Sequence, residues 1–272
     1  MTELNNAVVL LTGATGGFGQ ELTQLLLAAG SRVMRTDIDA NLLEQQSEVL
    51  HQHTHLGELL PSIVANLGSE DGCKFLYQQV QSLCYPIDIL INNAGIAMYG
   101  RMDEIPAQNW ELMMQINLLA PMRLCNLLVK EMIARRRGHI VNISSVAGWM
   151  APSGLTAYAT SKFGLRGLSE GLRNDVKHFN VKVTAVYPFF SRTPILHSDS
   201  FGSLAQGTTD LPNWLTTDPH KIMQATVRGI QQNKAEVFPD VQGQVLTRLK
   251  RYMPRFLQWS STRIIEPFQN PS

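Results

Sequence analysis

The chain has little of what marks membrane, secreted or nucleic-acid-binding proteins. Its formal net charge is only +1, so no basic excess would attract nucleic acid. No stretch reaches the roughly 18 apolar residues of a membrane span. The N-terminal MTELNNAVVLLTG lacks a basic region followed by a long apolar run. We therefore expect a cytoplasmic protein with no nucleic-acid partner.

Cysteine is also scarce, with three residues among 272. Cys73, Cys84 and Cys125 are odd in number and scattered, and their spacing fits neither a metal site nor a redox motif. Such cysteines usually act as small buried hydrophobic residues, in a protein that lies in a reducing compartment. We therefore expect free thiols and no metal site.

What the chain does have is a regular alternation of two patterns. Short β-rich runs alternate with longer segments whose apolar residues have helical spacing. The runs predicted to be strands are 7–12, 31–36, 62–66, 88–92, 139–144, 182–187 and 235–238. This alternation predicts βαβ units and a mostly parallel sheet with helices on both faces. No repeat or low-complexity linker interrupts it, so we predict one doubly wound α/β domain.

The first predicted strand ends in a glycine-rich turn. Its glycines have the spacing G-x-x-x-G-x-G, which lets backbone N–H groups and a helix N-terminus approach a pyrophosphate. The turn residues predicted to bind a dinucleotide are Thr12, Gly13, Gly17, Phe18 and Gly19. Asp37 ends the second strand, where an acidic side chain accepts hydrogen bonds from ribose hydroxyls. The alternatives are glycines that serve only the turn and a solvated aspartate.

A tyrosine and a lysine stand four residues apart in AYATSKFG, residues 157–164. On a helix this spacing stacks Tyr158 and Lys162 on one face. A nearby cation favours the phenolate, and a phenol with a lowered pKa can exchange a proton with a substrate. A solvated surface pair has the same spacing, so this pair needs support from the rest of the chain.

Five segments together resemble the short-chain dehydrogenase/reductase family, with its Tyr-x-x-x-Lys oxidoreductase motif, from residue 7 to about 238. In family order they are TGATGGFG, NNAG at 92–95, QINLLAP with Asn117, VNISS at 141–145 and YATSK at 158–162. The resemblance implies a single Rossmann-type domain with a seven-stranded, mostly parallel sheet. The seven strands predicted from the pattern agree with that fold.

The resemblance also implies roles for four residues. Tyr158 is expected to be the general acid/base, with Lys162 lowering its pKa and binding the ribose beside the nicotinamide. Ser145 is expected to hold the substrate oxygen, while Ser144 points to the other face of its strand. Asn117 resembles the asparagine that kinks a helix and holds a water in the proton relay, or it satisfies backbone groups at that kink.

Further positions resemble the family's cofactor contacts. Asn93, Ala94 and Gly95 correspond to the segment beside the adenosine ribose, whereas Asn92 is expected to brace neighbouring strands. Asn66 stands where the family often has an aspartate that contacts the adenine amino group. Thr193 stands where a threonine often meets the nicotinamide carboxamide.

These residues imply an NAD(P)-dependent oxidoreductase that interconverts an alcohol and a carbonyl. The alternative is a cofactor-binding scaffold or redox sensor without turnover. We expect NAD, with NADP possible, because Asp37 would repel the extra phosphate of NADP and the glycine-rich turn contains no Arg or Lys. Arg35 is the reservation, since it would lie on the same strand face as Asp37.

The substrate is expected to be an apolar small molecule, such as a lipid-like, steroid-like or aromatic alcohol or the corresponding ketone. In the family geometry its pocket would be surrounded by the lid segment 191–217 together with Met98, Tyr99, Trp149, Met150, Phe189 and Phe190. The alternative is that these residues pack against one another. Phe189 departs from the family pattern, which usually has glycine there, so it must either narrow the pocket or turn outward.

Two long helices, at about 107–136 and 154–179, resemble those that form a four-helix dimer interface in this family. Gly164, Gly167 and Gly171 would allow close approach, either to a partner or within the chain. We expect a homodimer or homotetramer.

We divide the chain into a catalytic domain, 1–239, and a basic amphipathic extension, 240–272. In VLTRLKRYM (245–253), helical spacing puts Val245, Leu246, Leu249, Tyr252 and Met253 on one side. Such a segment suits an anionic membrane surface, which would make the protein peripheral to the inner face of a membrane. The alternative is packing over the lid or across a partner chain.

Overall fold

The central strand shows why the chain forms a sheet covered on both sides. The computed structural model describes residues 1–52, 56–192, 199–204 and 216–253. Along β1 (Val8–Thr12), Val9 and Leu11 pack into one core while Val8 and Leu10 pack into another. Successive strand residues point to opposite faces, so an all-apolar strand must be buried on both.

The other strands of the main sheet lie parallel to β1. They are β2 (Arg32–Asp37), β3 (Glu58–Leu59), β4 (Ile63–Val64), β5 (Ile89–Asn92), β7 (Gly138–Ile143), β8 (Val181–Val186) and β10 (Glu236–Val237). Their order is β10-β8-β7-β5-β1-β2-β3, and β4 also pairs with β2. Since β3 and β4 pair with different ends of β2, they share one edge position. All seven predicted strands are present, and β3 is additional.

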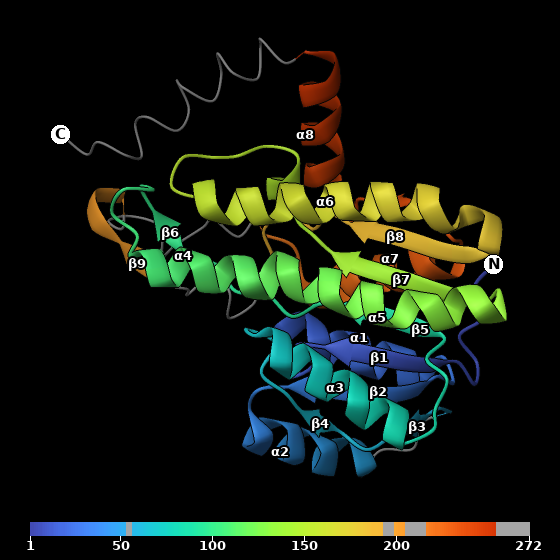
Figure 1. The fold of residues 1–272 in the computed structure, drawn as a ribbon. Coiled ribbons are helices and arrows are strands. Elements are labelled where there is room, and N and C mark those ends of the chain that lie inside the picture. Colours follow the sequence, from blue (N-terminus) through green and yellow to red (C-terminus); the bar gives the residue numbers. More distant parts are fainter. Residues whose placement is uncertain (53–55, 193–198, 205–215, 254–272) are drawn as a thin grey trace.

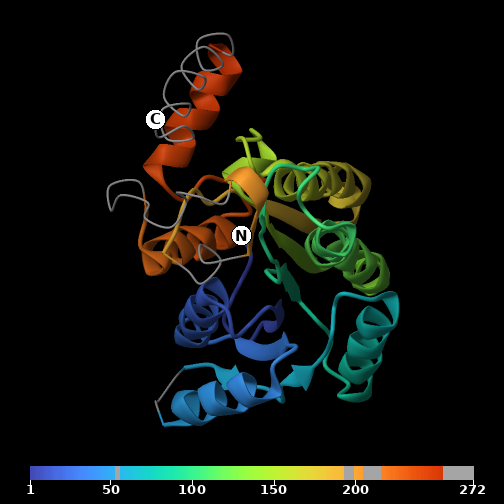
Figure 2. The same cartoon turned by 90° about the vertical axis from the view of Figure 1, so that its left-hand side faces the viewer.

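Helices cover both faces of this sheet (Figures 1 and 2). One core contains residues of α1 (Gly17–Ala28), α2 (Ala40–His51) and α7 (Pro219–Gln231). The other contains residues of α3 (Glu70–Ser82), α5 (Ala120–Arg135) and α6 (Thr156–Val176). The predicted fold class, a single doubly wound Rossmann-type domain, is confirmed.

One helical run is long and apolar enough to span a membrane by length and composition, namely Ala107–Arg135. It comprises α4 (Ala107–Met114), a π-helical turn η1 (Gln115–Leu119) and α5. The prediction that no segment has the length and apolar composition of a membrane span is therefore wrong for this run. The run packs against α3 and α6, and a core helix of a folded domain has the same length and composition.

A second, two-stranded sheet was not predicted. In it, β6 (Tyr99–Gly100) pairs with β9 (Ser200–Phe201), and a 3₁₀ turn, η5 (Gly202–Leu204), follows. This pairing brings the described middle of the segment 191–217 beside the loop that follows β5.

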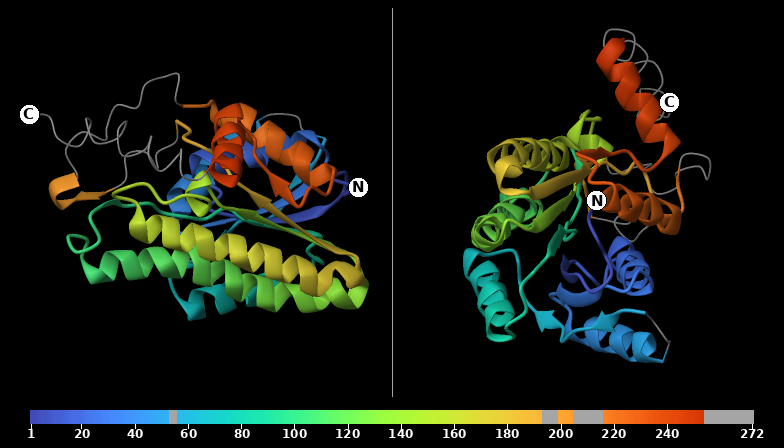
Figure 3. Two further views of the ribbon diagram at one scale, coloured as in Figure 1. Left: turned by 90° about the horizontal axis from the view of Figure 1, so that it is seen from above. Right: turned by 90° about the vertical axis from the view of Figure 1, so that its right-hand side faces the viewer.

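The last described helix, α8 (Val241–Tyr252), extends away from the sheet (Figure 3). Asp240 caps it, and its buried residues are Gly243 and Thr247. Val241 and Tyr252 are 70% and 74% exposed. The predicted division into an apolar and a polar side therefore does not match the buried and exposed sides of the helix. Residues 254–272 of the predicted extension lie outside the described part of the chain.

Candidate active site

The site lies where the order of strands reverses. From β1 the chain continues to β2 on one side, whereas β5 lies on the other side and leads to β7. The loops that leave the carboxyl ends of β1 and β5 therefore flank a crevice, the usual ligand site of such sheets. These loops carry the glycine-rich turn and the NNAG segment.

Hydrogen bonds join the two loops. The Thr12 hydroxyl accepts from the backbone N–H groups of Asn93 and Ala94, each at 3.0 Å. The Asn93 carboxamide donates to the carbonyls of Thr12 and Gly13, at 3.0 and 2.9 Å. Gly13 has φ +63°, and a Cβ there would lie 2.6 Å from the Cα of Ala94. Glycine is thus required both by its backbone and by this close approach.

The N-terminus of α1 opens onto the same crevice. Gly17 is the first residue of this helix, and no side chain among the described residues caps it. The ring of Phe18 packs against the core behind the turn. A Cβ on Gly19 would lie 2.2 Å from the carbonyl oxygen of Gly13. The free N–H groups of a helix N-terminus suit a pyrophosphate, so this turn fits a dinucleotide.

Asp37 ends β2 as predicted and is held by the glycine-rich turn. Its Oδ2 accepts from the backbone N–H and the hydroxyl of Thr15, at 2.9 and 2.7 Å. Its Oδ1 accepts from the N–H of Ile38 at 2.8 Å. The role of Thr15 was missed by sequence reasoning, although its place inside TGATGGFG was a usable signal.

Arg35 is buried and points toward α2. Its Nη2 donates to the carbonyl of Leu43 at 2.8 Å and also to the hydroxyl of Ser47. Burial lowers the pKa of this guanidinium, and the charge of Asp37 opposes that effect. The side chain is thus held away from the crevice. Its place on the same strand face as Asp37 therefore no longer argues for binding the extra phosphate of NADP.

Asn66, another predicted cofactor contact, lies apart from this network. Asn66 is exposed, and its side-chain oxygen accepts from the N–H of Gly68 at 2.9 Å. Thr193 lies outside the described residues. The predicted bracing role of Asn92 is confirmed, because its Nδ2 donates to the Oδ1 of Asn142 on the neighbouring strand at 2.8 Å.

Tyr158, Lys162 and Ser145 come together as predicted. Ser145 lies near enough to Tyr158 to lower the pKa of its phenol. The Ser145 hydroxyl donates to the carbonyl of Pro188 at 3.5 Å and accepts from the N–H of Ala147 at 3.1 Å. Lys162 is 4% exposed, its Nζ donates to the carbonyl of Ile143 at 3.0 Å, and it lies 5.7 Å from the centroid of the Tyr158 ring. The Ser144 hydroxyl donates to the backbone carbonyl of Lys162 at 3.1 Å, so Ser145 is the serine beside the tyrosine.

The pKa of the phenol differs from the expectation. Burial raises the pKa of Tyr158 to about 12, although the nearby Ser145 opposes this. Burial also lowers the pKa of Lys162 to about 8. The ammonium donates to a backbone carbonyl and not to the phenol, so desolvation outweighs its field. The phenol is therefore neutral near pH 7 and suited to donate a proton.

Asn117 lies in the π-helical turn η1 and is fully buried. Its side-chain oxygen accepts from the N–H of Ile96 at 2.9 Å. Its Nδ2 donates to the carbonyl of Ile96 at 2.8 Å and to the Ser161 hydroxyl at 3.1 Å. A Cβ on Gly95 would lie 3.3 Å from this Oδ1 and 3.4 Å from the Lys162 Nζ. Asn117 thus fixes the loop after β5 beside the lysine.

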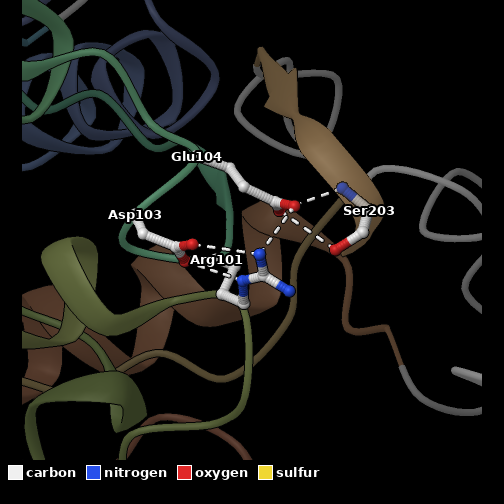
Figure 4. Close-up of polar contacts among 4 residues, drawn as sticks. All are labelled: Arg101, Asp103, Glu104 and Ser203. Atoms are coloured by element: carbon white, nitrogen blue, oxygen red, sulfur yellow. Dashed lines mark hydrogen bonds and ion pairs between the residues drawn. The ribbon is translucent and has the colours of Figure 1, made fainter.

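An apolar cluster lies beside Tyr158. Its members are Ile96, Met98, Ile105, Trp110, Met113, Ala157, Tyr158 and Phe201. Phe201 belongs to β9, and Glu104 helps to hold that segment by accepting from the N–H and the hydroxyl of Ser203, at 2.9 and 3.1 Å. Figure 4 shows this contact, with Arg101 bridging Asp103 and Glu104.

Phe189 belongs to another cluster. It packs with Trp149, Met150, Phe238 and Leu246 around Tyr187. Of the two expected placements, the ring therefore turns outward and does not narrow the substrate pocket. Its φ is outside the left-handed region, which explains why glycine is not required. Asp240 accepts from its N–H at 2.8 Å. The predicted pocket lining is therefore split, with Met98 beside Tyr158 and both Trp149 and Phe189 elsewhere.

Together, fold and site define a dinucleotide-binding α/β protein with the residues of an oxidoreductase. A family model described as short chain dehydrogenase matches residues 7–201. The chain belongs to the short-chain dehydrogenase/reductase family, as its motifs predicted.

Named relatives agree with this assignment. Nodulation protein G of Rhizobium meliloti (strain 1021) is 34% identical over 190 residues, covering 70% of this chain and 75% of the relative. The 3-oxoacyl-[acyl-carrier-protein] reductase FabG of Thermotoga maritima is 31% identical over 192 residues, covering 71% and 77%. A short-chain dehydrogenase from Sphingobium yanoikuyae in complex with NADPH has the same fold. Its TM-score is 0.79 at 24% identity, covering 94% of this chain and 95% of that one.

The close approach at Gly19 generates a stability prediction. Gly19→Ala should destabilise the protein by about 1–3 kcal/mol, because its Cβ would overlap the carbonyl of Gly13. Urea unfolding measures the change. Gly16→Ala is the matched control in the same turn, because its Cβ would meet only the Gly13 oxygen at 3.6 Å. Equal stability of the two variants would contradict the geometry.

The buried ammonium generates a second prediction. Burial lowers the pKa of Lys162 from its ordinary 10.5 to about 8, so at pH 7 the charged side chain is buried at a cost. Lys162→Met should therefore be more stable than wild type at pH 7, by about 1–3 kcal/mol.

The sign of the pH dependence follows from the same values. Between pH 8 and 10 the folded wild type releases the proton that the unfolded chain keeps, so wild-type stability rises with pH. The advantage of Lys162→Met should then shrink from pH 7 to pH 10 in urea titrations. An advantage that is constant with pH, or a less stable variant at both, would show that burial of the charge is not what costs stability.

Proposed function

We propose that this protein is an NAD-dependent oxidoreductase that interconverts an apolar alcohol and the corresponding carbonyl compound. The observation that carries the proposal is the buried Lys162 ammonium, 5.7 Å from the centroid of the Tyr158 ring, with Ser145 close enough to act on the phenol. A phenol, a hydroxyl and an ammonium at the mouth of a dinucleotide crevice are what carbonyl reduction requires.

Each side chain has a defined task. The nicotinamide cofactor, when bound, supplies or accepts the hydride. The Tyr158 phenol donates a proton to the substrate oxygen in reduction, and Ser145 donates a hydrogen bond to that oxygen. Lys162 binds the ribose beside the nicotinamide, and Asn117 holds the loop after β5 in place. The raised pKa of Tyr158 keeps the phenol protonated near neutral pH, so the proton that carbonyl reduction needs is present.

A scaffold or redox sensor that binds the cofactor without turnover is the alternative function. The contacts of Asn93 with Thr12 and Gly13 would serve such a protein equally well. The proton-donating pair of Ser145 and Tyr158 would have no task in it. We therefore favour catalysis.

The substrate proposal depends on the apolar cluster beside the phenol. Met98 and Phe201 pack near Tyr158, and Glu104 holds the segment that carries Phe201. A carbonyl carbon attached to rings or long chains would bury apolar surface there. The 3-oxoacyl-[acyl-carrier-protein] reductase FabG, one of the similar proteins, is by its name a reductase of an oxo group, which supports a carbonyl substrate.

For assembly, we propose a homodimer or homotetramer formed through α5 and α6. Gly164 packs against Leu118 of the same chain, but no described atom lies within 4 Å of a Cβ placed on Gly167 or Gly171. Met122 on α5 is also exposed. Contact of α8 with a membrane remains a weaker proposal, because the exposed side of that helix mixes Val241 and Tyr252 with Arg248.

The catalytic assignment predicts a loss of turnover. Tyr158→Phe should lower turnover by roughly two to four orders of magnitude, with cofactor affinity little changed, because only the proton donor is lost. Lys162→Met should lower turnover and should also weaken cofactor binding. Nicotinamide absorbance at 340 nm across a panel of long-chain, ring and small polar ketones measures this. Tyr252→Phe, an exposed tyrosine on α8, is the control.

Three outcomes would decide against the proposal. Near-native turnover of Tyr158→Phe would refute the mechanism. Faster turnover of small polar compounds than of long-chain or ring ketones would refute the apolar substrate. Cofactor binding without turnover of any compound would favour the scaffold.

Cofactor choice rests on Asp37. Its carboxylate would face the extra phosphate of NADP as a like charge, while Arg35 is tied to α2. NAD should therefore give the higher kcat/KM, and Asp37→Ser should narrow the difference. Asp39→Ser is the matched control, because it removes a neighbouring charge while serine can still cap α2. Equal or higher efficiency with NADP in the wild type would overturn this assignment.

A further inference from the structure

A second concave surface lies outside the crevice, between α6 and α8. It encloses about 580 Å³. Its lining residues are Trp149, Phe163, Arg166, Glu170, Arg173, Asn174, Glu236, Lys250 and Arg251. We call it the α6–α8 groove. None of these residues belongs to the catalytic set or to the cofactor contacts described above.

Two arginines of this groove, Arg166 and Arg173, have unsatisfied donors within the described part of the chain. Among the described residues, neither Arg166 nor Arg173 forms an ion pair with a carboxylate. The Nε atoms of both are buried, and within the described part of the chain they meet no hydrogen-bond acceptor. The indole Nε1 of Trp149 is also buried and has no hydrogen-bond acceptor among the described residues. Buried donors without acceptors are costly, and here three such donors belong to residues that line one groove.

The geometry of Arg166 leaves its donors available. Its guanidinium lies 3.3 Å from the centroid of the Trp149 ring. A guanidinium that stacks by its face keeps its N–H groups in the plane, where they can bind an oxyanion in bidentate fashion. The stack therefore fixes Arg166 without using its hydrogen bonds.

The cations lie close enough to feel one another. Lys250 donates from α8 to the backbone carbonyl of Trp149. Burial lowers the pKa of Lys250, and the like charge of Arg166 lowers it further. Both Arg166 and Arg173 also act on Tyr187, in opposition to the burial that raises the pKa of its phenol. A cluster of like charges held together in this way is stabilised by an anion.

Two carboxylates share the groove. Glu236 accepts from the Tyr187 phenol at 3.3 Å, and Glu170 is exposed on α6. Against them stand Arg166 and Arg173 of α6, with Lys250 and Arg251 of α8. The cations remain in excess, so the groove favours an anion.

We propose that the α6–α8 groove binds the phosphate group of a second ligand, held by Arg166, Arg173 and Lys250 beside the aromatic surface of Trp149. A phosphate has the oxygen geometry that matches in-plane guanidinium donors. The groove is larger than a phosphate, and its aromatic lining suits an apolar or planar remainder of the ligand. Either a soluble phosphate ester or a lipid headgroup presents this chemistry.

Calorimetric titration with inorganic pyrophosphate tests the proposal, at constant ionic strength and with excess NADH to fill the crevice. The double variant Arg166→Gln/Arg173→Gln should bind at least about tenfold more weakly than wild type, since it loses several charge-assisted hydrogen bonds. Arg248→Gln, on the exposed side of α8, is the matched control and should bind as wild type does. Glu170→Gln should bind more tightly, and it tests the groove without removing an arginine.

Vesicle flotation separates the two sources of phosphate. Arginine-dependent flotation with phosphatidic acid vesicles, but not with phosphatidylcholine vesicles, would identify a headgroup; pyrophosphate binding without flotation would identify a soluble ligand. No binding at millimolar pyrophosphate, equal binding by the double variant, or loss of dimers in that variant without pyrophosphate binding would overturn the proposal. Because the arginines lie outside the crevice, failure here leaves the proposed catalysis untouched.

Discussion

The burial of the Lys162 ammonium is the constraint on which the rest of the site depends. A cation inside the protein is unfavourable, and the lowered pKa of Lys162 records that cost. The carbonyl of Ile143 offsets part of this cost by accepting a hydrogen bond from the ammonium. The Ser144 hydroxyl donates to the backbone carbonyl of Lys162 and so holds the lysine in place. Gly95 gives the ammonium room, because a Cβ there would lie 3.4 Å from the Nζ. The packing of α6 on β7 and on the loop after β5 is thus organised around one charge.

Much of this arrangement could be predicted because parallel strands end at one edge of the sheet. The turn after β1 and the NNAG segment after β5 are about 80 residues apart in sequence, yet Thr12 and Asn93 hydrogen-bond. The spacing of the motif identified Tyr158 and Lys162 as the candidate pair, and the helix α6 places both on one face. Asp37 was located by the end of the second predicted strand, 31–36. Each of these inferences needs only local sequence and the topology of a doubly wound sheet.

What could not be predicted depends on contacts between distant segments. The strands β3, β6 and β9 have two residues each and lie outside the predicted β-rich runs. The strands β4 and β10 are equally short, but they lie inside the runs 62–66 and 235–238. The helical pattern of α8 was visible, but which side faces the protein is decided by Asp240, whose carboxylate binds both Gly243 and Phe189. The pKa of Tyr158 was misjudged for the same reason. Sequence shows that a lysine is near, whereas the extent of burial emerges only from the packed structure.

The net charge of +1 also conceals how the cations are placed. Lys162 meets the carbonyl of Ile143, and Lys250 meets the carbonyl of Trp149. A carbonyl dipole solvates a cation but does not neutralise it, whereas a carboxylate would do both. The positive field therefore survives at both places and can act on a ligand. Near-neutral composition excludes a strongly basic surface, but it leaves room for single cations whose charge is kept available by the choice of a neutral partner.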